Sequence, residues 1–349
     1  MTLLTRMRDS RIIFLIVGLL VAAFLTALAP EAEATATTNA TAVAPKIVAP
    51  KKVLKSLADG TTVETYQYGG LNPDNTGDVY YDKDWAPKTR AAIIVIHGGW
   101  WHNSDRKGEA VMAQQWRDAG FVVFNIDYRL GADQLNPDGT FRTGWRWPAQ
   151  RNDVYGALVW LRANADQFGV DPARIGLYGS SAGGHMAMVA AGEYGKGFIR
   201  AIAAQGAVMQ PDRAMYITMQ QGYQGDAPTG TIAKTFGYIT SLLGCSAEPT
   251  WGGPAFVFGS CGGKWKSFRP DQKFGADKPA MYLIKGENDP VEPKSALTSI
   301  EYWLDYHGQD HVTVLVPGRG HEETMVTGSA ADEVARRNAM ISWMRSKTA

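Results

Sequence analysis

The sequence predicts an α/β domain built on a mostly parallel sheet with helices on both faces. Short apolar runs alternate with helix-like segments, which is typical of parallel sheets. Two of these runs, Ala91–Ile96 and Phe121–Ile126, are apolar at almost every position, as strands buried on both faces are. A third observation is the pentapeptide Gly179–Gly183, which stands where an apolar strand gives way to a helix-like run.

The predicted elements begin at residue 63. Strands are predicted at 63–68, 78–81, 91–96, 121–126, 175–178, 202–208, 281–285 and 311–316. Helices are predicted at 109–119, 149–165, 182–191, 293–307 and 329–345, the last beginning at an S-x-x-D cap made by Ser329 and Asp332. The alternation breaks between 210 and 278, so this segment is predicted to be an insertion over the carboxyl edge of the sheet.

The N-terminus has the features of an export signal. Arginines precede the apolar run Ile12–Ala29, and an A-x-A site follows at Ala32–Ala34. We therefore expect residues 1–34 to be a cleaved signal peptide or, because the run just reaches the length of a membrane span, an uncleaved anchor. Residues 35–52 are expected to be a flexible spacer, and 53–349 the α/β domain. In both cases the domain is expected to be secreted or held at the cell envelope.

The net charge and the cysteine content limit the kinds of partner and cofactor that are expected. The formal net charge is +1, without the basic excess that nucleic-acid binding requires. Membrane contact is expected only through an uncleaved N-terminal segment, and the sequence does not indicate the oligomeric state. The two cysteines, Cys245 and Cys261, predict one disulfide in an exported chain, with two buried free thiols as the alternative. Their spacing matches no zinc site, so neither a metal nor an organic cofactor is expected.

The pentapeptide Gly179-Ser180-Ser181-Ala182-Gly183 is a G-x-S-x-G motif at a strand-to-helix turn. Such a turn lifts its central serine out of the backbone, and the flanking glycines let the chain turn without a side-chain clash. Ser181 is therefore a candidate nucleophile. The alternative is a plain Gly/Ser turn without a catalytic role. Residues elsewhere in the chain are needed to distinguish these two interpretations.

A nucleophilic serine needs a base and an orienting acid, and both are expected on loops after the carboxyl ends of parallel strands. His321 follows the strand predicted to end at Val316, so it is the candidate base. Asp289 follows the strand at 281–285 and is the candidate acid, with Glu287 as its competitor.

The oxyanion donors are expected from His97-Gly98-Gly99-Trp100, which follows a buried strand. Glycines allow backbone N–H groups to converge on a developing negative charge. We assign the amides of Gly99 and Trp100, together with that of Ala182 after the nucleophile. His97 is expected to brace the loop rather than to carry a proton.

With these motifs, the sequence resembles the α/β-hydrolase superfamily and, within it, the carboxylesterases that carry an H-G-G motif. The resemblance covers about residues 60–347. It rests on His97–Trp100, Asp127–Leu130, Gly179–His185, Gly286–Val291 and Gly320-His321, and on the chain order Ser, Asp, His. It implies the α/β-hydrolase fold. The sequence departs from the H-G-G-G form at Trp100, and the 210–278 segment gives no substrate by resemblance.

The expected activity is hydrolysis of carboxylic esters of moderate size through an acyl-enzyme. Trp100 and Trp101 flank the oxyanion loop and are candidate substrate contacts, within an aromatic-walled cleft suited to aryl or sugar-linked esters. The alternative is that the tryptophan rings belong partly to the core. Two alternatives remain open at this point. One is a peptidase on the same fold, and the other is a non-catalytic exported binding protein that uses a hydrolase scaffold.

Overall fold

The computed structural model describes residues 52–56, 60–69, 74–131, 134–135, 141–142, 144–211, 238–244, 262–321 and 325–349, all within the compact unit Ala44–Ala349. The predicted export segment, nearly all of the predicted spacer, Cys245 and Cys261 lie outside the described residues. Among the residues described, no helix has both the length and the apolar character needed to cross a bilayer.

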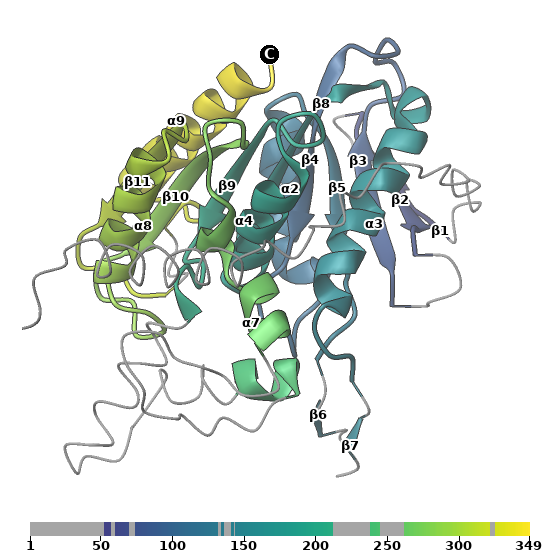
Figure 1. Cartoon of the computed structure of the whole chain (residues 1–349). Coiled ribbons are helices and arrows are strands. Elements are labelled where there is room, and N and C mark those ends of the chain that lie inside the picture. Colours follow the sequence, from purple (N-terminus) through teal and green to yellow (C-terminus); the bar gives the residue numbers. More distant parts are fainter. Residues whose placement is uncertain are drawn as a thin grey trace, which may run out of the picture. The chain divides into compact units, whose positions relative to one another are not determined.

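A nine-stranded sheet forms the centre of the described structure, in the order β1-β2-β3-β5-β4-β8-β9-β10-β11 (Figure 1). Six neighbouring strands, from β5 to β11, pair in parallel, whereas β1, β2 and β3 add an antiparallel edge. The strands are β1 Lys52–Ser56, β2 Thr62–Gln67, β3 Thr76–Tyr81, β4 Arg90–Ile96, β5 Val122–Ile126, β8 Val170–Ser180, β9 Ala201–Gln205, β10 Ala280–Gly286 and β11 His311–Val316; β6 Gln134–Leu135 and β7 Phe141–Arg142 form a separate pair.

Helices cover both faces of the sheet. They are α2 Ala110–Asp118, α3 Ala149–Ala163, α4 Ala182–Tyr194, α7 Gly262–Phe268, α8 Ser295–Tyr306 and α9 Ala331–Lys347, with 3₁₀ turns η1 Arg106–Glu109, η2 Ala165–Phe168 and η4 Pro270–Lys273. The apolar side chains of α3, α4 and α8 share one buried cluster, and those of α2 and α9 share a second. The mostly parallel sheet with helices on both faces is therefore confirmed.

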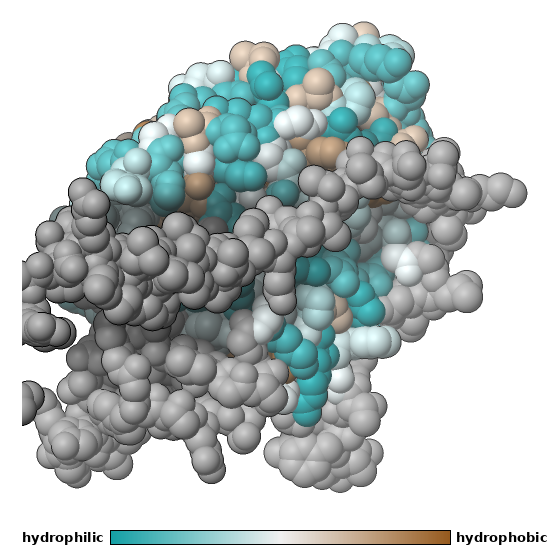
Figure 2. Space-filling model, in the orientation of Figure 1, coloured by the Kyte–Doolittle hydropathy of each residue, from teal (hydrophilic) through white to brown (hydrophobic). Residues whose placement is uncertain are grey.

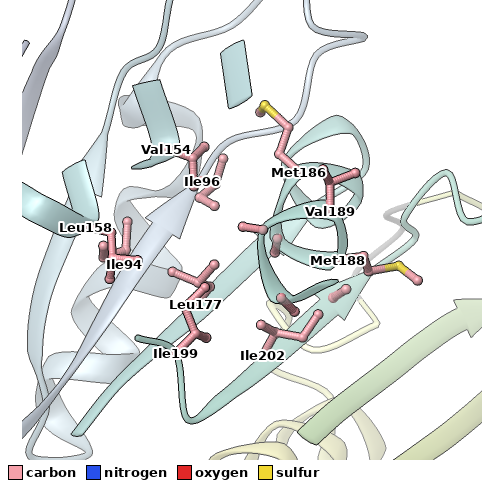
Figure 3. Close-up of a cluster of buried hydrophobic side chains, with 14 of the residues drawn as sticks. Ile94, Ile96, Val154, Leu158, Leu177, Met186, Met188, Val189, Ile199 and Ile202 are labelled. Atoms are coloured by element: carbon pink, nitrogen blue, oxygen red, sulfur yellow. The ribbon is translucent and has the colours of Figure 1, made fainter. Parts of the chain in front are cut away.

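Strand β4 shows why this sheet needs two helical layers. Successive side chains of a strand point to opposite faces. Ile94 and Ile96 join the cluster with α3 and α4, whereas Ile93 and Val95 join the cluster with α2 and α9, and all four are 0% exposed. Figure 3 shows the first cluster, in which side chains of β4, α3 and α4 meet. The part of the surface that Figure 2 shows for the described residues is mostly hydrophilic.

Three details differ from the sequence-based expectation. Strand β1 was not predicted, and its first residue, Lys52, falls in the segment expected to be a spacer. Helix α9 has Ala330 as its N-cap, and the Ala330 amide donates to the Glu333 carboxylate at 3.1 Å. The predicted Ser329/Asp332 cap is therefore wrong, because the carboxylate that reaches back to the helix start is one residue further along.

The described parts of the predicted 210–278 insertion include buried helical structure. Residues 238–243 are helical, and α7 follows near the end of the segment. Phe268 of α7 is 0% exposed and belongs to the same buried cluster as α4. The end of this segment is therefore part of the core rather than a separate layer over it.

Candidate active site

Ser181, His321 and Asp289 form one hydrogen-bonded chain. His321 Nε2 lies 2.9 Å from Ser181 Oγ, and His321 Nδ1 lies 3.0 Å from Asp289 Oδ2. The three residues follow β8, β11 and β10, so the parallel strands bring them to the same edge of the sheet. An imidazole between a hydroxyl and a carboxylate can take the serine proton while the carboxylate fixes its tautomer.

The turn at Ser181 is as sharp as the motif predicts. Ser181 has φ 50° and ψ −118°, an uncommon conformation for a residue with a side chain, and its amide donates to the Gln205 carbonyl at 2.8 Å. The two motif glycines sit against backbone. A Cβ on Gly179 would lie 2.3 Å from the carbonyl carbon of Gly183, and a Cβ on Gly183 would lie 2.1 Å from the Ile96 carbonyl oxygen. Both positions therefore require glycine.

Asp289 is held from three sides. Besides His321, its Oδ2 accepts a hydrogen bond from Lys285 Nζ at 2.7 Å, and its Oδ1 accepts one from the Val291 amide at 2.8 Å. Burial raises the pKa of Asp289, but the hydrogen bond from His321 and the charge of Lys285 outweigh burial and hold this pKa below its usual value. The carboxylate is therefore ionised at neutral pH, as an orienting acid must be.

Glu287, the competitor for the acid role, faces elsewhere. Its carboxylate pairs with Lys294 at 3.0 Å and accepts from the Gly318 amide at 3.3 Å. Among the described carboxylates, only that of Asp289 is hydrogen-bonded to the imidazole of His321. The sequence-based preference for Asp289 thus agrees with the geometry.

The loop at 97–103, here called the His97 loop, has a strained backbone. Gly99, Trp100 and Trp101 all have positive φ, at 102°, 59° and 62°. The Gly99 carbonyl accepts from the amides of His102 and Asn103, which closes the loop on itself. None of the loop, turn and cap hydrogen bonds among the described residues uses the amide of Gly99, Trp100 or Ala182 as donor. These are the three amides predicted to bind an oxyanion.

His97 and Tyr128 stabilise this loop through contacts with its own backbone carbonyls. The two rings stack at 4.2 Å, and the Tyr128 hydroxyl lies 3.1 Å from the His97 carbonyl and 3.3 Å from that of Gly98. His97 Nδ1 donates to the Gly98 carbonyl at 2.7 Å. Burial lowers the pKa of His97, so the ring stays neutral, which fits a structural brace.

The two tryptophans of the loop have different surroundings. The half-buried Trp100 ring stacks near His321 at 6.5 Å and lies 5.4 Å from Tyr238. Trp101 is 0% exposed, and its Nε1 donates to His185 Nδ1 at 3.3 Å. Trp101 is therefore a core residue, and its prediction as a substrate contact is wrong. Trp147 and Trp265 are also buried, so these two rings belong to the core as well.

His185 links three parts of the site. It stands one turn after Ser181, accepts from Trp101 of the His97 loop, and donates from Nε2 to the Phe268 carbonyl of α7 at 2.7 Å. Burial lowers the pKa of His185 to about 3, so the ring is neutral and can accept at one nitrogen while donating at the other. The only sequence signal for this role is its position on the helix of the nucleophile.

Known proteins share this arrangement of strands. The BD-FAE family model matches residues 78–204, which include β4, β5 and β8. Esterase LipC of Mycobacterium tuberculosis is 26% identical over 274 residues, covering 78% of this chain. The solved structure of a bacterial heroin esterase matches with a TM-score of 0.64 at 20% identity, covering 83% of this chain and 86% of that one.

The chain has the α/β-hydrolase fold. Esterase LipQ of the same organism is 24% identical to this chain over 237 residues, covering 65% of the chain. The chain spans 62% of LipC and 49% of LipQ. At 20% identity, the likeness to the solved structure bears on the fold alone. The fold is thus shared with the solved esterase structure, and the sequence similarity extends to the two mycobacterial esterases.

Proposed function

We propose that this α/β-hydrolase is a carboxylic ester hydrolase that works through an acyl-enzyme on Ser181. The observation that carries the proposal is the continuous chain from Ser181 Oγ through His321 to Asp289, with links of 2.9 and 3.0 Å. The names of its relatives, esterases LipC and LipQ, support the same class of reaction.

The mechanism has two steps. His321 Nε2 takes the proton as Ser181 Oγ attacks the acyl carbon, and the amides of Gly99, Trp100 and Ala182 stabilise the oxyanion. The alkoxide of the substrate takes that proton from His321 and departs as the alcohol. A water molecule then attacks the acyl carbon, with His321 again as base, and the acid departs as Ser181 recovers its proton.

The test is turnover of p-nitrophenyl acetate by the wild type and by Ser181→Ala. The variant should lose at least about 10³-fold in kcat, because the nucleophile is gone. Ser346→Ala, a change at an exposed serine, is the matched control and should keep wild-type turnover. Equal rates in Ser181→Ala and wild type would exclude the proposed nucleophile. A Ser181-dependent turnover of peptides that exceeds that of esters would instead favour the peptidase alternative.

The substrate proposal is narrower than the cleft that the sequence suggested. Only Trp100 of the two candidate tryptophans keeps exposed surface, and its ring lies near that of His321. We propose that esters of moderate size bind against this ring. Trp100→Ala should raise KM for aryl esters more than for acetyl esters of small alcohols, and an equal change for both series would contradict an aromatic contact.

We further propose that residues 1–34 direct export of the protein. The motivation is the order of arginines, apolar run and A-x-A site in the sequence. Expression of the full chain in a secreting bacterial host, followed by N-terminal sequencing of the exported form, distinguishes cleavage after Ala34 from an anchored chain. Retention of activity in the cytoplasm would contradict export in both forms.

A further inference from the structure

A lysine and two carboxylates are buried together behind the candidate catalytic acid. The side chains of Lys285, Asp289 and Glu292 are all 0% exposed. Lys285 Nζ lies 2.7 Å from Asp289 Oδ2 and 3.8 Å from Glu292 Oε2. Three buried charges in contact are costly to desolvate, so such a cluster needs a specific reason to persist.

Lys285 and His321 share one acceptor atom. Both donate to Oδ2 of Asp289, at 2.7 and 3.0 Å. The lysine charge favours the ionised form of the carboxylate, which accepts the hydrogen bond from His321. Lys285 thus bears on the orientation of the base through the charge of Asp289.

Glu292 extends the cluster to the nucleophile side of the site. Its carboxylate oxygens accept from the amides of Met209 and Gln210, at 2.9 and 2.6 Å. These residues continue the chain beyond Gln205, whose carbonyl accepts the Ser181 amide. Burial raises the pKa of Glu292, while Lys285 and the two amides oppose this rise. Without a nearby cation, two carboxylates in this space would tend to share a proton.

From this juxtaposition we propose that Lys285 is a positioning residue for ester hydrolysis, which keeps Asp289 ionised and directed at His321 in the presence of Glu292. The inference rests on the proposed function of Ser181. Two other charged groups near the acid have partners of their own: Glu287 pairs with Lys294, and Arg319 pairs with Glu333 and Asp332. Among the described ion pairs, Lys285 is the buried lysine that contacts Asp289.

Substitutions of Lys285 and of Glu292 should have opposite effects on the pH–rate profile. In Lys285→Met, protonation of the site is favoured, because a positive charge is lost next to the carboxylate and the imidazole. The midpoint of the acid limb of kcat/KM should rise by roughly one pH unit. In Glu292→Gln, a negative charge is lost and Lys285 acts on Asp289 alone, so the midpoint should fall. Lys294→Met, which breaks an exposed pair near the same loop, is the matched control and should leave the midpoint unchanged.

The profiles are measured with the full-length enzyme and p-nitrophenyl acetate, alongside Ser181→Ala. A rise in Lys285→Met and a fall in Glu292→Gln support the proposal. If Lys285→Met does not fold, the fall in Glu292→Gln still decides the matter. Unchanged midpoints with an inactive Ser181→Ala would overturn the role of Lys285 alone, as would a lower kcat in Lys285→Met without a shift. Activity that survives in Ser181→Ala would overturn the proposed function and this inference together.

Discussion

Gly183→Ala tests how the start of α4 sets the geometry of the site. A Cβ at this position would lie 2.1 Å from the Ile96 carbonyl oxygen and 2.6 Å from that of His97. Both are backbone atoms where β4 passes into the His97 loop, so no flexible side chain can yield. The start of α4, with Ser181 and Ala182, must therefore move away from the loop that carries Gly99 and Trp100.

The magnitude follows from that distance. An ordinary Cβ contact begins at about 3.4 Å, so the two segments must separate by about 1.3 Å. Misplacement of reacting groups by about 1 Å can cost 10²-fold in rate, so we expect kcat/KM to fall by about that factor. Overpacking of a rigid contact costs about 3 kcal/mol, which corresponds to a fall in Tm of about 5 °C for a domain of this size.

The assay combines thermal unfolding with ester turnover for Gly183→Ala and for Gly197→Ala. Gly197 is the matched control, since a Cβ there meets nothing within 4 Å. A Tm and kcat/KM equal to those of Gly197→Ala would refute the packing argument. A lower Tm with unchanged kcat/KM would refute the link between this contact and the oxyanion amides.

Three further predictions concern the support of the site. Because the pKa of His185 is lowered to about 3, the unfolded state binds more protons than the folded state between about pH 3 and 6.5. The free energy of unfolding therefore decreases as the pH is lowered through that window. Urea unfolding should therefore show the wild type losing about 2 kcal/mol more than His185→Gln between pH 7 and pH 5, and equal losses would contradict the assignment. Arg129→Ala breaks the bidentate pair with buried Asp153 and should lower the free energy of unfolding by about 3–5 kcal/mol, against less than about 1 kcal/mol for Lys88→Ala in an exposed pair. Tyr128→Phe removes the hydroxyl that holds two carbonyls of the His97 loop, so kcat/KM should fall about tenfold, whereas an unchanged value would exclude the brace.

The strands and the candidate triad could be predicted from the sequence because they depend on patterns of neighbouring residues. A parallel strand covered on both faces must be apolar throughout, so β4 and β5 appear as continuous runs. Polar residues that directly follow such runs reach the same edge of the sheet. The sequence therefore predicted that Ser181, Asp289 and His321 lie in one site. Strand β1 was missed because it is a short antiparallel edge strand beside a polar segment.

The supporting residues were not accessible in the same way. Trp101 was expected at the substrate because it adjoins the H-G-G motif, yet its ring is buried against His185 and Phe268. Sequence position gives the neighbour along the chain, but it does not give the direction of a side chain in a loop with positive φ. Lys285 did leave a signal, a lysine within the otherwise uncharged β10, although its partners could not be named from the sequence.

The sequence by itself determined an α/β chain with a serine at a strand-to-helix turn and an acid and a base after later strands, because periodicity and glycine requirements are local properties. The tertiary structure decided which groups meet: His321 between Ser181 and Asp289, Lys285 between two carboxylates, and His185 between the His97 loop and α7. Burial and hydrogen-bond partnership join residues far apart along the chain, so they exist only once the strands are side by side.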